Sequence, residues 1–329
     1  MPIRDWIGRD VKKWLVPLAL FIAGVTLFIG VARLSEYSWG PVLTTLKSVD
    51  PTLAILTLAL LSGVFLCAAM KWRIVTEAQC GPSGSLFFYF RYISLAVLVG
   101  QVFPLSLTNS SIRIYALKRQ ANHGIMTTAG LFLWDQLFDF IALSILMCIG
   151  VVYVFGNLPL VMTLGLVLGS GFCIIAGMNL LTATIQITIK LLCSWERIPE
   201  KKRIRLGQLT SDLLSVQVAR KLFSLAMIKY MLSAAVYTCL FSLCGLHTML
   251  FDIYWAAPTA EMAGVLSQMP GGLGALDWTW VGALKTNGLD AKGAAIAVLS
   301  MRFLLSSAYV IVTGTIWGVH FVRSKKFIS

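Results

Sequence analysis

Several ionisable side chains stand inside apolar stretches of this 329-residue sequence, where charge is costly. Each costs about 2.5–3.5 kcal/mol to insert into a membrane helix, so it needs a partner or a water-filled cavity. Asp135 and Asp139 are four residues apart and therefore share one helix face. They predict a carboxylate pair that either binds structural cations or exchanges protons. The whole set of coupling or structural charges comprises Asp135, Asp139, Glu261 and Lys229.

A glycine-rich break splits the apolar run near the C-terminus into two short segments. It reads Pro-Gly-Gly-Leu-Gly-Ala-Leu-Asp at positions 270–277. A helix that restarts after such a break leaves unpaired N–H groups and a positive dipole end inside the membrane, where a phosphate can bind. The alternative is a packing hinge without a ligand, because glycine also permits close contact between membrane helices.

A second break follows Pro104, and its polar residues are expected to cap the returning helix. Arg302, in the last apolar run, carries a guanidinium that suits bidentate contact with phosphate. Lys229 and Arg302 are also candidate partners for the carboxylate pair, although extension of Lys229 toward the basic inner face is the commoner outcome. The predicted substrate-binding residues are Pro270, Gly271, Gly272, Gly274, Asp277, Arg302, Thr108, Asn109, Ser110 and Arg113.

The composition is that of a polytopic membrane protein. Hydrophobic residues make up 58% of the chain, charged residues only 12%, and the mean hydropathy is +0.82. We therefore expect an all-α fold and a single transmembrane domain over residues 1–329. The net charge of +13 indicates membrane topology and anionic head groups rather than nucleic acid. The cysteines and histidines show no metal-ligand spacing, so neither a metal nor a cofactor is expected.

The apolar runs predict six full spans and two broken-helix or re-entrant hairpins. Lys71, Trp72 and Arg73 are expected to mark the end of the second span at the membrane surface. Residues 192–221 predict a cytoplasmic basic loop followed by an amphipathic helix. The hairpins occupy residues 86–117 and 254–284, and the spans are 15–32, 53–70, 125–155, 160–181, 222–246 and 291–322.

The distribution of Lys and Arg predicts the orientation of these segments. With both termini cytoplasmic and hairpins that do not change sides, most of the 27 basic residues lie on the inside. The halves 1–157 and 158–329 then run in opposite directions, as in transporters built from inverted repeats. The basic residues left on the outside are Arg33, Lys47, Lys285 and Lys292.

The order of these features resembles the transmembrane, flippase-like region of the lysylphosphatidylglycerol synthase family. The stretch 270–277 is similar to that family's Pro-Gly-Gly-Leu-Gly-x-x-Glu, with Asp277 in place of the glutamate. Arg302 matches an arginine of the family's last span, and Trp134 to Asp139 resembles its Glu-Arg-x-x-Asp pattern, with Asp135 and Gln136 as departures. The aminoacyl-transferase domain of fuller members is absent from this sequence. The resemblance therefore implies translocation of a lipid without its synthesis.

The function expected is movement of an anionic phospholipid or a lipid-linked phosphate between leaflets of a bacterial cytoplasmic (inner) membrane. Such a protein is a transporter and not an enzyme. Two alternatives stay open: an intramembrane transferase acting on a polyprenyl-phosphate lipid, and a non-transporting membrane scaffold whose charges pair with one another. The expected partners are the lipid and the membrane, with a second copy of the chain or a synthase as further candidates.

Overall fold

The computed structural model of the chain is helical throughout the part that it describes. It describes residues 25–33, 49–81, 84–121, 125–156, 216–247 and 250–325, together with the isolated positions 40, 165 and 169. Within these ranges the backbone forms helices and turns, and the β-type pairing seen there is one isolated bridge. The all-α class predicted from the sequence is confirmed.

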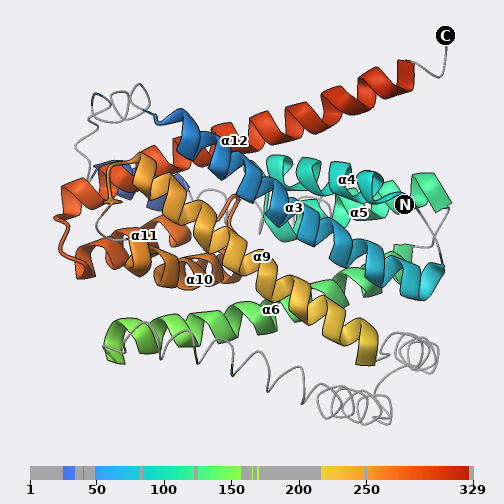
Figure 1. Ribbon diagram of the computed structural model, residues 1–329, viewed down its shortest axis with the longest axis horizontal. Helices are drawn as coiled ribbons and strands as arrows, with labels where there is room; N and C mark the ends of the chain where they lie inside the picture. Colours follow the sequence, from blue (N-terminus) through green and yellow to red (C-terminus); the bar gives the residue numbers. More distant parts are fainter. Residues whose placement is uncertain are drawn as a thin grey trace, which may run out of the picture. The chain divides into compact units, whose positions relative to one another are not determined.

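The helices follow the apolar runs of the sequence, because a helix satisfies every backbone N–H and C=O group within its own segment. Residues 25–33, from the first predicted span, are also helical. The labelled helices of Figure 1 are α3 (Pro51–Cys80), α4 (Leu86–Val99), α5 (Leu105–Ala121), α6 (Ile125–Gly156), α9 (Val216–Leu243), α10 (Leu250–Ser267), α11 (Ala275–Thr286) and α12 (Ala291–Lys325).

Four helices of the described part are long and apolar enough to cross a membrane. They lie in α3, α6, α9 and α12 and correspond to four of the six spans predicted from the sequence. The predicted span 160–181 and most of the loop 192–221 fall outside the described residues, so the number of spans and the inverted repeat stay predictions. The four helices are Pro51–Ala78, Trp134–Val152, Val216–Leu243 and Ala291–Val322.

Helix α3 extends beyond the end predicted for it. The sequence predicted that the span ends at Met70 and that Lys71 and Trp72 lie at the membrane surface. That prediction is wrong, because the helix continues to Cys80 and both side chains are buried, Lys71 at 1% and Trp72 at 2% exposure. Trp72 packs edge-on against Tyr89 of α4, with the ring centroids 4.9 Å apart. These residues therefore belong to the protein interior.

The chain divides into two compact units. Unit 1 comprises Met1–Ser62, Ser94–Ser111 and Ser233–Ser329, and unit 2 comprises Gly63–Ile93 and Ile112–Leu232. Helices α3, α4, α5 and α9 each contribute residues to both units. The predicted single domain over residues 1–329 and its halves stay predictions.

In unit 1, α10 and α11 form a helical hairpin that packs against α12. Helix α11 contacts both α10 and α12, and the two orange helices α10 and α11 can be followed next to each other in Figure 1. Trp280 of α11 is fully buried and packs on Tyr237 and Phe241 of α9, with ring centroids 5.2 and 4.8 Å away. The aromatic contacts fix the helix that follows the glycine-rich break.

Candidate functional site

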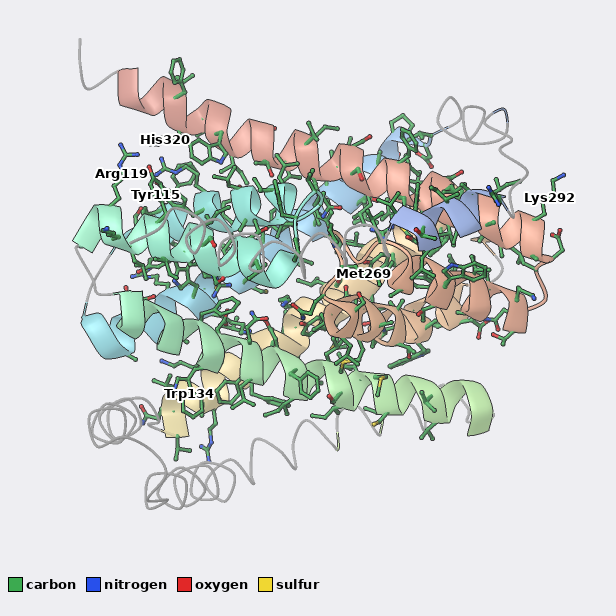
Figure 2. All side chains as sticks on the ribbon, turned by 180° about the vertical axis from the view of Figure 1, so that it is seen from behind. Tyr115, Arg119, Trp134, Met269, Lys292 and His320 are labelled. Atoms are coloured by element: carbon green, nitrogen blue, oxygen red, sulfur yellow. The ribbon has the colours of Figure 1, made fainter. Side chains whose placement is uncertain are left out.

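The break between α10 and α11 is a tight turn of residues 268–274, and Met269 of this turn is labelled in Figure 2. Gly271, Gly272 and Gly274 have φ angles of 56°, 67° and 81°, a region that L-residues rarely adopt. A Cβ on Gly272 would lie 3.3 Å from the Cα of Gly264 on α10. Glycine is therefore needed both for the backbone conformation and for the close approach of the turn to its own helix.

The two breaks predicted from the sequence meet in unit 1. Pro104 and Pro270 form an isolated antiparallel bridge. The Gly271 N–H donates to the Gly100 carbonyl over 2.8 Å, and a Cβ on Gly271 would lie 3.2 Å from the Gln101 carbonyl oxygen. The turn after α4 and the turn after α10 are thus in direct backbone contact.

Asp277 and Arg302 form a buried ion pair beside this contact. The Asp277 carboxylate is fully buried, and its Oδ1 accepts from Nε of Arg302 over 2.5 Å. Its Oδ2 accepts from the Gly274 N–H over 2.9 Å, so the same carboxylate caps α11. Arg302 also donates from Nη1 to the Gly271 carbonyl over 2.7 Å. Asp277 therefore neutralises both the helix N-terminus and the guanidinium.

One nitrogen of the Arg302 guanidinium is left without an acceptor in the described part of the structure. The residue is 8% exposed, and Nη2 is buried without a hydrogen-bond partner among the described residues. The phenol groups of Tyr237 and Tyr309 lie close enough to interact electrostatically with the guanidinium. A buried cationic donor without an acceptor is unfavourable, and an anionic oxygen would satisfy it.

The residues predicted to cap the other hairpin have a different role. Capping by Thr108, Asn109 and Ser110 is wrong because α5 begins at Leu105, so these residues lie within its first two turns. The Thr108 hydroxyl donates back to the Pro104 carbonyl over 3.1 Å, and the Ser110 hydroxyl donates to the Leu107 carbonyl over 3.0 Å. The hydroxyls are therefore used inside the helix and do not close its N-terminus.

Glu261 of α10 accepts a short hydrogen bond from the Ser233 hydroxyl of α9 within unit 1. Glu261 and Asp277 both interact electrostatically with Tyr237. Glu261 was predicted as a coupling or structural charge, and Ser233 was not predicted as its partner.

A second buried charge cluster lies in unit 2. Nζ of Lys71 is 2.5 Å from Oδ1 of Asp139 and 3.0 Å from Oδ1 of Asp135. Arg113 donates from Nη1 to Oδ2 of Asp135 over 2.6 Å, and Lys229 donates to Oδ2 of Asp139 over 2.9 Å. Of the two partners that the sequence offered for the carboxylate pair, Lys229 contacts Asp139, whereas Arg302 pairs with Asp277. Arg113, predicted as a substrate-binding residue, contacts Asp135 in this cluster.

Sequence reasoning missed Lys71, the central cation of the cluster. It stands beside Trp72 and Arg73 in a pattern typical of a membrane surface, so the pattern was interpreted as the end of a span. The available signal was the apolar pair Ile74-Val75, which continues the helix beyond the basic residues. Within the described residues no group of three or more His, Cys, Asp or Glu side chains could hold a metal.

Comparison with known protein families identifies the transmembrane region. The model of the lysylphosphatidylglycerol synthase transmembrane region matches residues 14–313, and no further domain is shown. Neither a curated protein nor a solved structure matches the chain. Since the match covers most of the sequence, the resemblance noted from the residues is confirmed, and with it a multi-pass membrane protein connected with membrane lipids. The chain belongs to the lysylphosphatidylglycerol synthase transmembrane-region family.

Proposed function

We propose that the chain moves an anionic phospholipid or a lipid-linked phosphate between membrane leaflets. The observation that carries this proposal is Arg302, a buried guanidinium at the meeting point of two interrupted helices. One of its nitrogens has no acceptor among the residues that the structure describes. Membership of a family named for a lipid synthase supports a lipid as the ligand.

Asp277 helps to orient the Arg302 guanidinium toward the ligand. By accepting from Nε, the carboxylate fixes the orientation of the guanidinium, and the Gly271 carbonyl fixes Nη1. The remaining nitrogen, Nη2, then donates to a phosphate oxygen of the lipid. Release requires only that this contact be broken, because Asp277 keeps the charge of Arg302 compensated throughout.

A second candidate function is a non-transporting membrane scaffold. The observation that favours it is the mutual pairing of the buried charges, Asp277 with Arg302 and Asp139 with Lys71 and Lys229. A scaffold needs these pairs for folding alone, whereas a transporter needs Arg302 for its cargo as well.

The test is a leaflet-exposure assay in vesicles that contain the purified protein. Acyl-labelled phosphatidylglycerol is the probe, dithionite bleaches the outer leaflet, and labelled phosphatidylcholine is run in parallel. Arg302→Met is expected to slow transfer of phosphatidylglycerol about 10- to 100-fold, since it removes a charge-assisted hydrogen bond. Lys292→Met, which removes an exposed cation from the same helix α12, should leave the rate unchanged.

A stability control separates transport from folding. Arg302→Met alone leaves the Asp277 carboxylate buried without its cation, which costs about 3–5 kcal/mol. The double variant Asp277→Asn with Arg302→Met removes both charges and should fold. If this folded double variant moves phosphatidylglycerol as fast as the wild type, Arg302 does not bind the cargo. If the wild type itself moves no phosphatidylglycerol, the scaffold is the better description.

A further inference from the structure

In the charge cluster of unit 2, basic and acidic side chains alternate along a row. It runs from Arg113 to Asp135, then to Lys71, to Asp139 and finally to Lys229. A cation stands at each end of this row, so the cluster holds three positive and two negative charges. Four of its members are at most 6% exposed, and the Lys229 side chain is 17% exposed. The cluster therefore holds one surplus positive charge in the protein interior.

The carboxylates of the cluster do not neutralise this surplus positive charge. Nζ of Lys71 already has three oxygens around it, from the two carboxylates and from the Asp135 carbonyl at 3.2 Å. Both oxygens of each carboxylate already lie within 3.0 Å of a cation. Each carboxylate oxygen thus already faces a cation of the cluster, although Oδ1 of Asp135 accepts no hydrogen bond within the described residues.

At the Arg113 end of the cluster, one guanidinium nitrogen lacks an acceptor among the described residues. Nη1 of its guanidinium is bound to Asp135, but Nε is buried without a hydrogen-bond partner among the described residues. Cζ of Arg113 lies over the rings of Trp72 and Phe132, 5.2 and 5.4 Å from their centroids. Aromatic rings stabilise the faces of a guanidinium but accept no hydrogen bond at its edge.

We propose that this cluster is a second anion site, distinct from Arg302, and that it binds one oxyanion of the phosphate class at the Nε edge of Arg113. The edge of a guanidinium that carries Nε matches two oxygens of a tetrahedral oxyanion, which a chloride ion cannot do. One bound negative charge balances the surplus of the cluster. A lipid head group and free inorganic phosphate share this chemistry.

The test measures thermal stabilisation of the full-length protein in a non-ionic detergent at constant ionic strength. One series contains inorganic phosphate and another contains soluble short-chain phosphatidylglycerol, with sodium chloride and short-chain phosphatidylcholine as the reference series. Each series is repeated on the double variant Asp277→Asn with Arg302→Met, so that binding at Arg302 does not contribute. Stabilisation in the phosphate series identifies free phosphate as a ligand, and stabilisation by phosphatidylglycerol alone identifies a lipid head group.

Four substitutions made in that background test the site. For an anion site, two of them should change the affinity for the anion in opposite directions. Arg113→Lys keeps the charge but loses the paired donors of the edge, and the affinity should fall about tenfold or more. Lys229→Met removes the surplus charge and should weaken binding, whereas Asp139→Asn raises the surplus to two and should strengthen it. Arg73→Met, in the partly exposed pair with Glu77, is the matched control and should change nothing.

The proposal is overturned if neither ligand stabilises the protein beyond its reference series. It is also overturned if Lys229→Met and Asp139→Asn shift the affinity in the same direction, because a purely structural cluster loses stability in both and has no reason to distinguish them. Where a variant does not fold in detergent, Lys229→Gln and Asp135→Asn test the same two directions.

Discussion

At the scale of single residues, the turn between α10 and α11 depends on positions that tolerate no side chain. Gly272 has a φ of 67°, and its Cα faces the Cα of Gly264 so closely that a Cβ would lie 3.3 Å away. The same Cβ would lie 3.3 Å from Cβ of Leu276. Neither neighbour can move aside, because one is backbone and the other is the stem of a helical side chain.

Substitution of Gly272 by alanine should therefore destabilise the protein by about 1–3 kcal/mol. The matched control is Gly282→Ala within α11, where a Cβ meets no atom within 4 Å. Alanine there should be neutral or stabilising by up to about 1 kcal/mol, since glycine is the weaker helix former. The measurement is thermal unfolding of both variants in one detergent. Equal losses at the two positions would contradict the geometry of the turn.

At the scale of helices, the continuation of α3 past Met70 brings Lys71 into the protein interior. Lys71 and Arg73 are neighbours in sequence, yet Lys71 bridges two buried carboxylates while Arg73 forms a partly exposed pair with Glu77 four residues on. The two cations of one helix thus provide a direct comparison of a buried and an exposed ion pair.

Lys71→Met should cost about 3–5 kcal/mol, because it deprives Asp135 and Asp139 of a shared cation. Arg73→Met should cost at most about 1 kcal/mol, since the side chains of that pair are 40% and 31% exposed and water screens them. Unfolding of the two variants by heat or denaturant measures the difference. A similar small loss for both would place Lys71 at the membrane surface, as the sequence had predicted.

The helices also show which features could be predicted from the sequence and why others could not. The breaks at Pro104 and Pro270 were predictable, because proline and positive-φ glycines interrupt a helix by local geometry. The starts of helices were less certain: α5 begins directly after Pro104, and Thr108 bonds within the helix although its type is typical of a cap. Lys71 was missed because its burial depends on carboxylates 64 and 68 residues away, a long-range contact that local pattern does not encode.

At the scale of the whole molecule, the chain is a multi-pass membrane protein of its family. The distribution of Lys and Arg predicts its topology. The pairing of Asp277 with Arg302 joins residues that the sequence had placed in one site. Arg113 was also predicted as a substrate-binding residue, and its ion pair with Asp135 of α6 was not predicted, because a contact between two helices is not encoded in local sequence.

The orientation predicts opposite exposure for the ends of the two hairpins. In a cysteine-free background, Lys285→Cys should react with a membrane-impermeant maleimide on intact cells, whereas Lys118→Cys should react only after the membrane is opened. The distribution of Lys and Arg places the first position outside and the second in the cytoplasm. Labelling of both positions from the same side would contradict the inverted repeat.

Gly271 connects three separate parts of unit 1 through its backbone alone. Its N–H is bonded to Gly100 after α4, its carbonyl receives Nη1 of Arg302 from α12, and the residue itself belongs to the turn between α10 and α11. A displacement of α12 that carries Arg302 along must break the bond to the Gly271 carbonyl or drag the turn with it. Because the Gly271 N–H is bonded to Gly100, a displacement of α12 is transmitted through the two peptide groups of this single glycine to the turn that follows α4.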